Sequence, residues 1–240
     1  MPVDYILPVM RRLLALGVLA LAGCGVDPLP EPPAAPKLVG DVVTDACPVC
    51  DGQTRIHAGP GSVVDADTIW VADLDQPLPI VTAPVANDGS FEVFFDAIEG
   101  DELRLQARRG DLRSAPVDLL MPASGVLEPA PRPLADCFTL AAELALDDTA
   151  VAQSSTATIR VEHTCSGALT VDSIALRAPS ADLGVSAPGT PLVLAPGDFV
   201  DVAIDFHPTT TGLREEVLIV EVSAPAADRR AVTLFGRGHP

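Results

Sequence analysis

An eight-residue stretch near the C-terminal end, 199–206 (FVDVAIDF), most constrains the fold of this 240-residue chain. Apolar side chains at Val200, Val202, Ile204 and Phe206 alternate with Asp201, Ala203 and Asp205. Successive side chains of a β-strand point to opposite faces of a sheet. The stretch therefore predicts a strand with one buried face and one solvent-exposed face.

Shorter apolar runs in the same half of the chain also predict strands. In 158–162, Ile159 and Val161 are expected to point inward. The run 217–222 is suited to the middle of a sheet, and 232–235 is expected to form a final strand that ends at Gly236.

The first half of the chain contains short strand candidates separated by turn signals. The candidates are 54–57, 68–72, 79–83, 90–95, 102–108 and 116–121. Sequences such as 59–61 (GPG) and 87–89 (NDG) between them are typical of tight turns. Residues 103–107 (LRLQA) alternate between apolar and polar, which predicts a strand with one buried face. Strands at this spacing, without intervening helical patterns, indicate an all-β fold of antiparallel sandwiches.

Two proline-rich stretches divide the chain. Residues 24–37 contain five prolines and little to bury, so we expect a polyproline II spacer that rises about 3.1 Å per residue. Residues 123–135 form a second predicted linker. We therefore predict two β-sandwich domains, at 38–122 and 136–240.

The N-terminal region has the features of an export signal. Arg11 and Arg12 precede an apolar run at 13–22, which is much shorter than the roughly twenty residues that a membrane-spanning helix requires. Residues 1–23 are therefore predicted to be a signal peptide, with translation beginning at Met1 or Met10.

The end of this leader, Leu21-Ala22-Gly23-Cys24, resembles the lipobox of bacterial lipoproteins. The resemblance implies that the Cys24 thiol receives a diacylglycerol and that the chain is cut just before it. It also implies a lipid-anchored protein of the bacterial cell envelope. Gly25 after the cysteine favours the outer membrane, on its periplasmic or outer face. An ordinary cleaved leader with an incidental cysteine is the alternative.

The four remaining cysteines are disulfide candidates in an oxidising compartment. Cys47 and Cys50 have the spacing of a redox pair, but acidic flanks and the absence of a helical pattern favour a short-loop disulfide. Cys137 and Cys165 are predicted to form a staple within the second domain, worth about 3 kcal/mol by the chain-entropy estimate. A shared zinc site is less favoured because the two pairs lie in different predicted domains.

Charge excludes one class of partner. The chain has 15 basic and 33 acidic residues, a formal net charge of −18, and such a polyanion repels nucleic acid. The aspartate pairs Asp65/Asp67 and Asp73/Asp75 offer the oxygen ligands that calcium prefers, but the spacing of an EF-hand is absent. We predict no cofactor and no resident metal.

The candidate catalytic residues do not form a known motif. The four histidines, His57, His163, His207 and His239, are scattered, and neither a Gly-x-Ser-x-Gly elbow nor a His-Glu-x-x-His helix is present. We therefore do not expect an enzyme, and a hydrolase or thiol oxidoreductase is the least favoured class. Trp70, the single tryptophan, is expected to pack in a core.

The first predicted domain resembles small bacterial Ig-like modules. The resemblance is carried by 58–64 (AGPGSVV), 86–91 (ANDGSF), 99–103 (EGDEL) and 113–117 (RSAPV). Such modules act as spacers or adhesive units in surface proteins, and the resemblance brings no catalytic residues with it.

The second predicted domain resembles the ASH/Hydin-type immunoglobulin domain, which is related to the major sperm protein fold. The matching segments are 154–161, 167–171, 194–198, the strand end 206–208, 211–212 and 232–238. The family often has an asparagine after the second strand, where this chain has 162–165 (EHTC). The turn there is therefore expected to be held differently.

Together these features predict a lipid-anchored envelope protein that acts as a non-catalytic binding or scaffolding module through two Ig-like domains. Its expected partners are the membrane, through the lipid on Cys24, and proteins of the envelope. A glycan ligand has little support because the chain is poor in aromatic residues. The alternative is an accessory subunit of a larger envelope assembly, in which exposed sandwich edges pair with a partner strand.

Overall fold

The computed structural model describes residues 34–46 and 53–240, and all regular structure in these ranges is β-strand. The predicted signal peptide, Cys24, Cys47, Cys50 and most of the linker at 24–37 lie outside them. Among the described residues, no helix has the length and hydrophobicity needed to cross a bilayer. Residues 35–240 form one compact unit, and their strands divide into two sandwiches.

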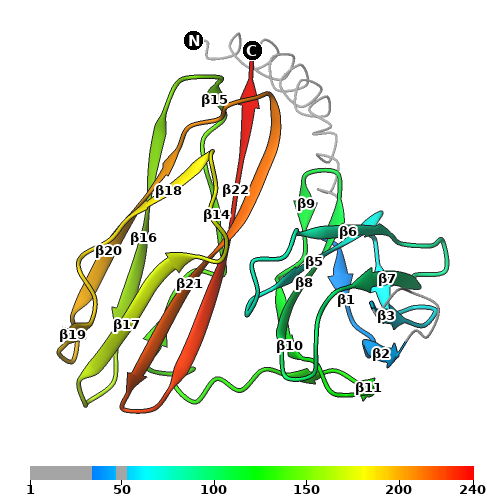
Figure 1. Cartoon of the computed structure of the whole chain (residues 1–240), viewed down its shortest axis with the longest axis horizontal. Coiled ribbons are helices and arrows are strands. Elements are labelled where there is room, and N and C mark those ends of the chain that lie inside the picture. Colours follow the sequence, from blue (N-terminus) through cyan, green and yellow to red (C-terminus); the bar gives the residue numbers. More distant parts are fainter. Residues whose placement is uncertain (1–33, 47–52) are drawn as a thin grey trace, which may run out of the picture. The chain divides into compact units, whose positions relative to one another are not determined.

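The first sandwich contains twelve strands. They are β1 (Lys37–Leu38), β2 (Val43–Ala46), β3 (Thr54–Ala58), β4 (Val63–Val64), β5 (Thr68–Asp73), β6 (Val81–Pro84), β7 (Phe91–Phe95), β8 (Glu102–Arg109), β9 (Leu112–Arg113), β10 (Val117–Leu120), β11 (Gly125–Val126) and β12 (Glu128–Pro129). One sheet has the order β11-β2-β3-β7, and the other has the order β12-β10-β8-β5-β6 with β9 beside β8 (Figure 1). All six strands predicted in this half are present, with ends within two residues of the prediction.

The second sandwich contains the remaining strands. They are β13 (Phe138–Thr139), β14 (Glu143–Ala145), β15 (Thr149–Ala150), β16 (Ser155–His163), β17 (Leu169–Leu176), β18 (Leu183–Ser186), β19 (Leu192–Leu194), β20 (Phe199–Phe206), β21 (Gly212–Ala224) and β22 (Asp228–His239). Its sheets have the orders β13-β16-β20-β18 and β14-β22-β21-β17-β19. The pairing is antiparallel except where β14 and β15 lie parallel to β22. The all-β sandwich fold is confirmed.

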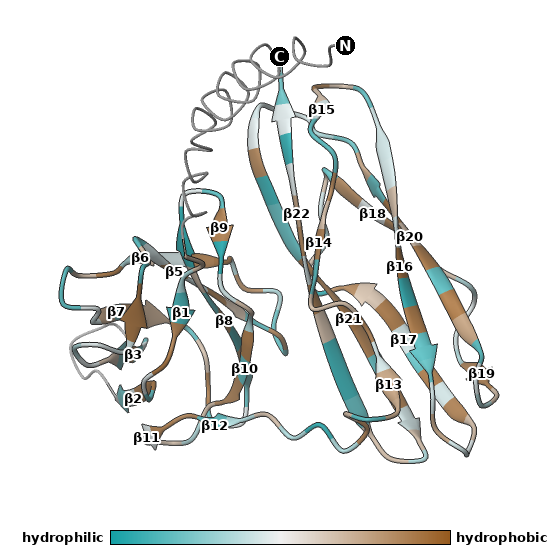
Figure 2. Ribbon diagram, turned by 180° about the vertical axis from the view of Figure 1, so that it is seen from behind, coloured by the Kyte–Doolittle hydropathy of each residue, from teal (hydrophilic) through white to brown (hydrophobic). Residues whose placement is uncertain are grey.

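Each sandwich has its own apolar core. In β20, Val202, Ile204 and Phe206 are fully buried, whereas Asp201 on the opposite face is exposed, so the predicted two-faced strand is confirmed. The alternating colours along β16 and β20 show the same pattern (Figure 2). The run 217–222 lies in β21 between β22 and β17, which confirms its predicted place inside a sheet.

The turn at 87–89 has the geometry that its sequence predicts. Gly89 has a φ of +81°, a conformation that side chains rarely adopt, and an added Cβ would collide with the Val63 carbonyl. The Asp88 carboxylate accepts hydrogen bonds from the backbone N–H of Ser90 (3.0 Å) and its hydroxyl (2.7 Å). The turn therefore depends on local side-chain chemistry, which is why sequence alone locates it.

A disulfide joins Cys137 to Cys165, with the Cα atoms 4.6 Å apart. His163, two residues before Cys165, is fully buried. Its Nδ1 lies 3.3 Å from the Cys137 carbonyl and its Nε2 contacts the Gly167 carbonyl. The turn after β16 is thus held by a histidine and a disulfide.

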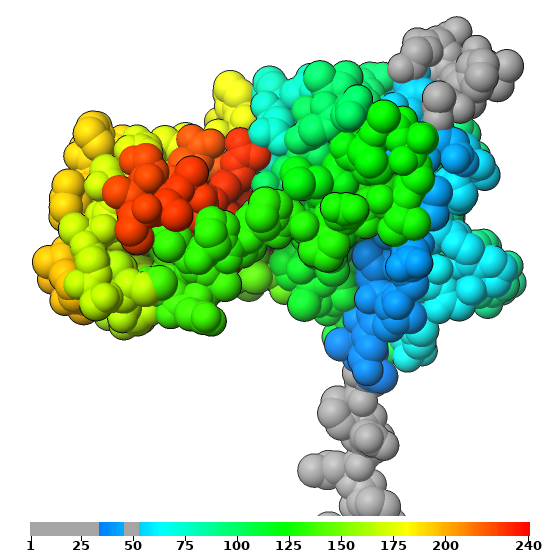
Figure 3. Space-filling view, turned by 90° about the horizontal axis from the view of Figure 1, so that it is seen from below, coloured from blue at the N-terminus to red at the C-terminus, as the bar shows by residue number. Residues whose placement is uncertain are grey.

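The segment 123–135, predicted as a linker, carries two short strands and buried side chains. β11 pairs with β2, and β12 pairs with β10. Leu127 belongs to the first core and Leu134 to the second, and the Leu134 N–H donates to Asp228 Oδ2 at 2.8 Å. Figure 3 shows this green segment beside the orange-red strands of the second sandwich. Proline removes a ladder donor but does not prevent packing at a sheet edge, which explains how a proline-rich segment becomes ordered.

Candidate functional site

The candidate site is the buried contact between the two sandwiches, and β8 supplies its central face. Leu103, Leu105 and Ala107 of β8 point into the first core. On the opposite face, Arg104, Gln106 and Arg108 are also buried. The alternation in 103–107 is therefore correct, but the prediction of one buried face is wrong. The second sandwich covers the polar face of the strand.

The polar side chains of β8 hydrogen-bond directly to the second sandwich. Arg104 Nη1 donates to the Ala142 carbonyl at 3.1 Å and to Thr233 Oγ1 at 3.3 Å. Gln106 Nε2 donates to Glu143 at 2.5 Å and to the Ser114 carbonyl at 2.8 Å. These bonds satisfy donors that would otherwise be buried at a high cost in free energy.

A carboxylate of the second sandwich accepts hydrogen bonds from two arginines of the first. Glu215 accepts from Arg108 Nη1 at 2.7 Å and from Arg113 Nη1 at 2.9 Å. Arg113 also stacks 3.9 Å from the centre of the Phe235 ring. Burial lowers the pKa of Arg108, although the hydrogen bond and charge of Glu215 oppose that shift. The Arg108 guanidinium stays charged because the pKa of an arginine in water is so high.

Arg177, directly after β17 in the second sandwich, makes the same kind of contact in the opposite direction. Its side chain is almost fully buried and is paired with Glu216 at 2.9 Å. Nη1 donates to backbone carbonyls of the first sandwich, at Gln76 (2.9 Å) and Leu78 (2.7 Å). Each sandwich therefore sends arginines into the other, and each of these arginines has a carboxylate partner.

An apolar cluster completes the contact. Trp70, Ala72 and Leu74 from β5 and the loop after it pack against Val217 and Ala231 of the second sandwich. Arg108 lies 4.8 Å from the centre of the Trp70 ring, a distance at which a cation and an aromatic face attract each other. Trp70 does pack in a core, as predicted, but the core is the one between the sandwiches.

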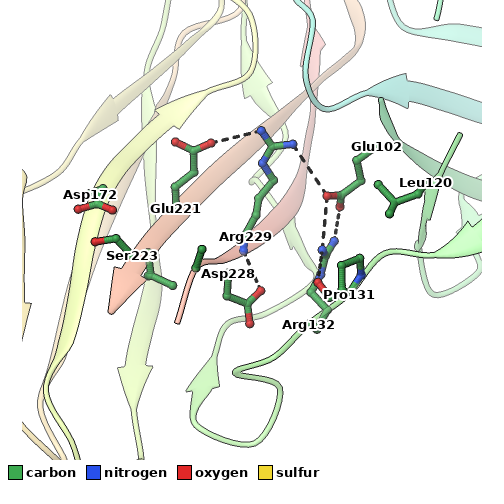
Figure 4. A pocket seen from close by; sticks show the side chains of 11 residues that line it. Glu102, Leu120, Pro131, Arg132, Asp172, Glu221, Ser223, Asp228 and Arg229 are labelled. Carbon is green, nitrogen blue, oxygen red and sulfur yellow. Dashed lines mark hydrogen bonds and ion pairs between the residues drawn. The ribbon is translucent and has the colours of Figure 1, made fainter. Parts of the chain in front are cut away.

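A cleft of about 460 Å³ opens at the edge of this contact. Figure 4 shows Glu102 and Arg132 on one side of it and Glu221 and Arg229 on the other. Arg229 lies 3.2 Å from Glu221 and 3.9 Å from Glu102, and Arg132 contacts Glu102 and lies 2.9 Å from Asp118. Each of these charged side chains already has a partner of opposite charge. The lining of the cleft is therefore a continuation of the ionic contact between the sandwiches.

Three aspartates meet next to this cleft. Asp73 at the end of β5, Asp75 in the following loop and Asp101 before β8 each place one oxygen within 4.8 Å of the others. Asp73 is fully buried, and burial raises its pKa to about 6, with the negative charge of Asp101 adding to the shift. The other predicted pair, Asp65 and Asp67, is exposed and joins no such group among the described residues.

The predicted catalytic candidates are distributed over separate surfaces. His57 Nε2 lies 2.8 Å from Asp45, and His239 contacts the carbonyl of its neighbour Pro240. His207 Nδ1 lies 3.0 Å from Ser154 Oγ, an exposed Ser–His contact in which no described carboxylate hydrogen-bonds to the ring. Cys137 and Cys165 are joined to each other, so they do not supply thiolates to a zinc site.

The interface residues themselves were not predicted from the sequence. A signal for them exists in the arginines and glutamine of β8 and in the adjacent Glu215-Glu216 of β21. Basic side chains on one strand and acidic side chains on another are complementary, but the pattern does not reveal that the two strands face each other. Solvent exposure was the simpler expectation for both.

No family model matches the chain, and no curated protein matches it. Among solved structures, it is similar to the ASH/PapD-like domain of human CEP192, with a TM-score of 0.39 and 16% identity over 50% of this chain and 96% of that one. It is also similar to the Vibrio cholerae VesB protease, with a TM-score of 0.40 and 10% identity over 84% of this chain and 90% of that one. A Porphyromonas gingivalis protein of unknown function matches with a TM-score of 0.36 and 11% identity, over 85% of this chain and all of that one. Likenesses at this level establish no shared function.

Proposed function

We propose that this protein is a non-catalytic binding or scaffolding protein, anchored in the bacterial cell envelope by lipid on Cys24. The observation that carries the proposal is the buried charged contact between the sandwiches. Arg104, Arg108 and Arg177 each cross it to bond with the other sandwich. A scaffold has to hold its binding surfaces in a fixed relation, and directional, fully paired bonds serve that purpose.

One further observation supports the proposal, and a second shows what the lipid anchor has to overcome. The Cys137–Cys165 disulfide fits an oxidising compartment outside the cytoplasm. The formal charge of −18 disfavours contact with anionic lipid headgroups. Attachment through a lipid on Cys24 overcomes this repulsion, because each buried methylene contributes about 0.8 kcal/mol.

The test is affinity capture of the full-length protein from solubilised envelopes of a diderm host. Wild type is compared with Cys24→Ser, which lacks the lipidation site, and with Arg104→Ala, which weakens the contact between sandwiches. We expect envelope proteins in fixed stoichiometry with the wild type and their loss or reduction with both variants. Glycan-array binding without protein partners would identify an adhesin, and absence of both would contradict the proposal.

The hydrolase alternative has a separate test. The exposed Ser154–His207 contact is the feature that a serine hydrolase would use. A fluorophosphonate probe should leave the wild-type protein unlabelled under the proposal. Labelling that disappears in Ser154→Ala but persists in Ser155→Ala would replace the scaffold proposal by a catalytic one.

A further inference from the structure

The three aspartates beside the cleft are brought together by strand pairing. β5 and β8 are antiparallel, with Asp73 opposite Leu103, so the end of one strand lies beside the start of the other. Asp73 and Asp75 therefore meet Asp101, although Asp101 comes 28 and 26 positions after them in the sequence. One oxygen from each carboxylate lies within 4.8 Å of the others.

Backbone donors hold each carboxylate in place. Asp73 Oδ1 accepts from the N–H groups of Asp75 (2.8 Å) and Gln76 (3.0 Å). Asp101 Oδ2 accepts from the Ile98 N–H and from Gln76 Nε2, both at 2.8 Å. Asp75 Oδ2 accepts from the Glu102 N–H at 2.7 Å. The arrangement is thus preorganised by the loop itself.

One oxygen of this group has no donor among the residues that the structure describes. Asp73 Oδ2 is buried and has no hydrogen-bond partner in 34–46 or 53–240, while the whole Asp73 side chain is inaccessible to solvent. A buried carboxylate oxygen needs either a proton or a cation to offset its desolvation.

We propose that Asp73, Asp75 and Asp101 bind a calcium ion. All three ligands are carboxylates, the oxygen donors that hard cations prefer, and calcium–oxygen distances of about 2.3–2.6 Å let two ligands lie up to about 4.6–5.2 Å apart. The observed limit of 4.8 Å fits that span. Asp75 is about one third exposed, which gives the ion and its remaining water ligands access from solvent.

Neighbouring charges leave the group net negative. Arg229 Nη1 donates to Asp75 Oδ1 at 2.7 Å, so it offsets one of the three carboxylates. The backbone of the same loop also accepts Arg177, at Asp73 O and Gln76 O. A calcium ion here would stabilise the loop on which Arg177 rests, and therefore the contact between the sandwiches as well.

Calcium titration of the full chain at pH 7.5 tests the proposal. Sites in extracellular modules bind with a Kd of about 10⁻⁴–10⁻³ M, so 10 mM CaCl2 should raise Tm by about 3–11 °C relative to EDTA. Asp73→Asn keeps the acceptor for the two N–H groups but removes the charge, and should lose this shift. Asp67→Asn, a matched change in the exposed pair, should keep it.

Terbium(III) luminescence provides a second measurement if Asp73→Asn does not fold. Trp70 is the single tryptophan and lies on the same strand as Asp73, so it should sensitise a bound terbium ion. We expect emission that calcium displaces at about 0.1–1 mM. A wild-type Tm that responds to pH but not to calcium, or equal calcium responses in Asp73→Asn and Asp67→Asn, would overturn the proposal in favour of a shared proton.

Discussion

Strands β8 and β20 have the same alternating sequence pattern but different surroundings. In β20, the inward residues are buried and Asp201 on the other face is exposed. In β8, the outward residues Arg104 and Arg108 are buried, as the inward leucines are. Alternation therefore identifies which side chains share a face, but it does not tell whether water or another sandwich covers that face.

The ion pairs on the two faces differ in the same way. The Arg104 and Asp118 side chains are 4% and 15% exposed, whereas Arg160 and Asp201 in β16 and β20 are 52% and 41% exposed. Both pairs have two guanidinium–carboxylate hydrogen bonds, at 2.7 and 3.0 Å in the first and at 2.8 and 2.9 Å in the second. Similar geometry should thus have very different consequences for stability, because water screens only the exposed pair.

Trp70→Ala should give the largest effect. It removes the main aromatic side chain of the contact between sandwiches, and we expect the free energy of unfolding to fall by about 3–5 kcal/mol. The measurement is urea unfolding followed by circular dichroism. Phe199→Ala on β20 is the control, because Phe199 is 51% exposed, and it should change stability little. Equal losses of stability in the two variants would show that water reaches the face of Trp70 as it reaches the face of Phe199.

Arg104→Ala should follow closely, with a loss of about 3–5 kcal/mol, since it leaves the partly buried Asp118 without one of its two arginine partners. Urea unfolding measures this loss as well. Arg160→Ala is the matched control on the exposed pair and should have little effect. A small change at Arg104 would mean that water reaches the contact.

Replacing both Cys137 and Cys165 by serine should cost about 3 kcal/mol, because a loop with a sequence separation of 28 residues is no longer closed in the unfolded chain. The change lies in the second sandwich, away from the contact. Trp70 should therefore keep its native fluorescence while the urea midpoint falls. Loss of the native Trp70 signal under folding conditions would show that the staple also supports the contact.

Low pH should also weaken the ion pair between Arg104 and Asp118. Burial alone would raise the pKa of Asp118, but the hydrogen bonds and charges of Arg104 and Arg132 outweigh burial and hold the pKa below its usual value. A carboxylate whose pKa is lower in the folded than in the unfolded protein stabilises the fold at pH values above its unfolded-state pKa. This stabilisation is lost as the pH falls through about 4 toward the folded-state pKa. Stability measured between pH 5 and pH 3 should fall less steeply in Asp118→Asn than in wild type, and an unchanged slope would contradict the assignment.

Much of each sandwich follows from the sequence. The ends of β20 match its prediction because apolar and polar residues alternate without interruption. β21 and β22 extend well beyond the predicted 217–222 and 232–235. Most of their extra residues are charged or glycine, such as Glu215, Arg229 and Gly236, and these residues carry no apolar periodicity. Pairing with the neighbouring strand holds them in the sheet.

The candidate site follows from the sequence only in part. Asp73 and Asp75 stand out as adjacent carboxylates, but Asp101 joins them through the pairing of β5 with β8, which is a long-range contact. The arginine contact also depends on which sheet faces which. Such information is held in tertiary packing, whereas the lipidation of Cys24 rests on local sequence and stays a prediction.

The central claim is that the second sandwich covers the outer face of β5 and β8. Acrylamide quenching of Trp70 tests this claim most directly. Trp70 is the single tryptophan and is fully buried at that contact, so the native chain needs no substitution or label. We predict blue-shifted emission and a quenching constant several-fold below that of the urea-unfolded chain. Native quenching that approaches the unfolded value would show that the sandwiches do not pack together, and would contradict the account.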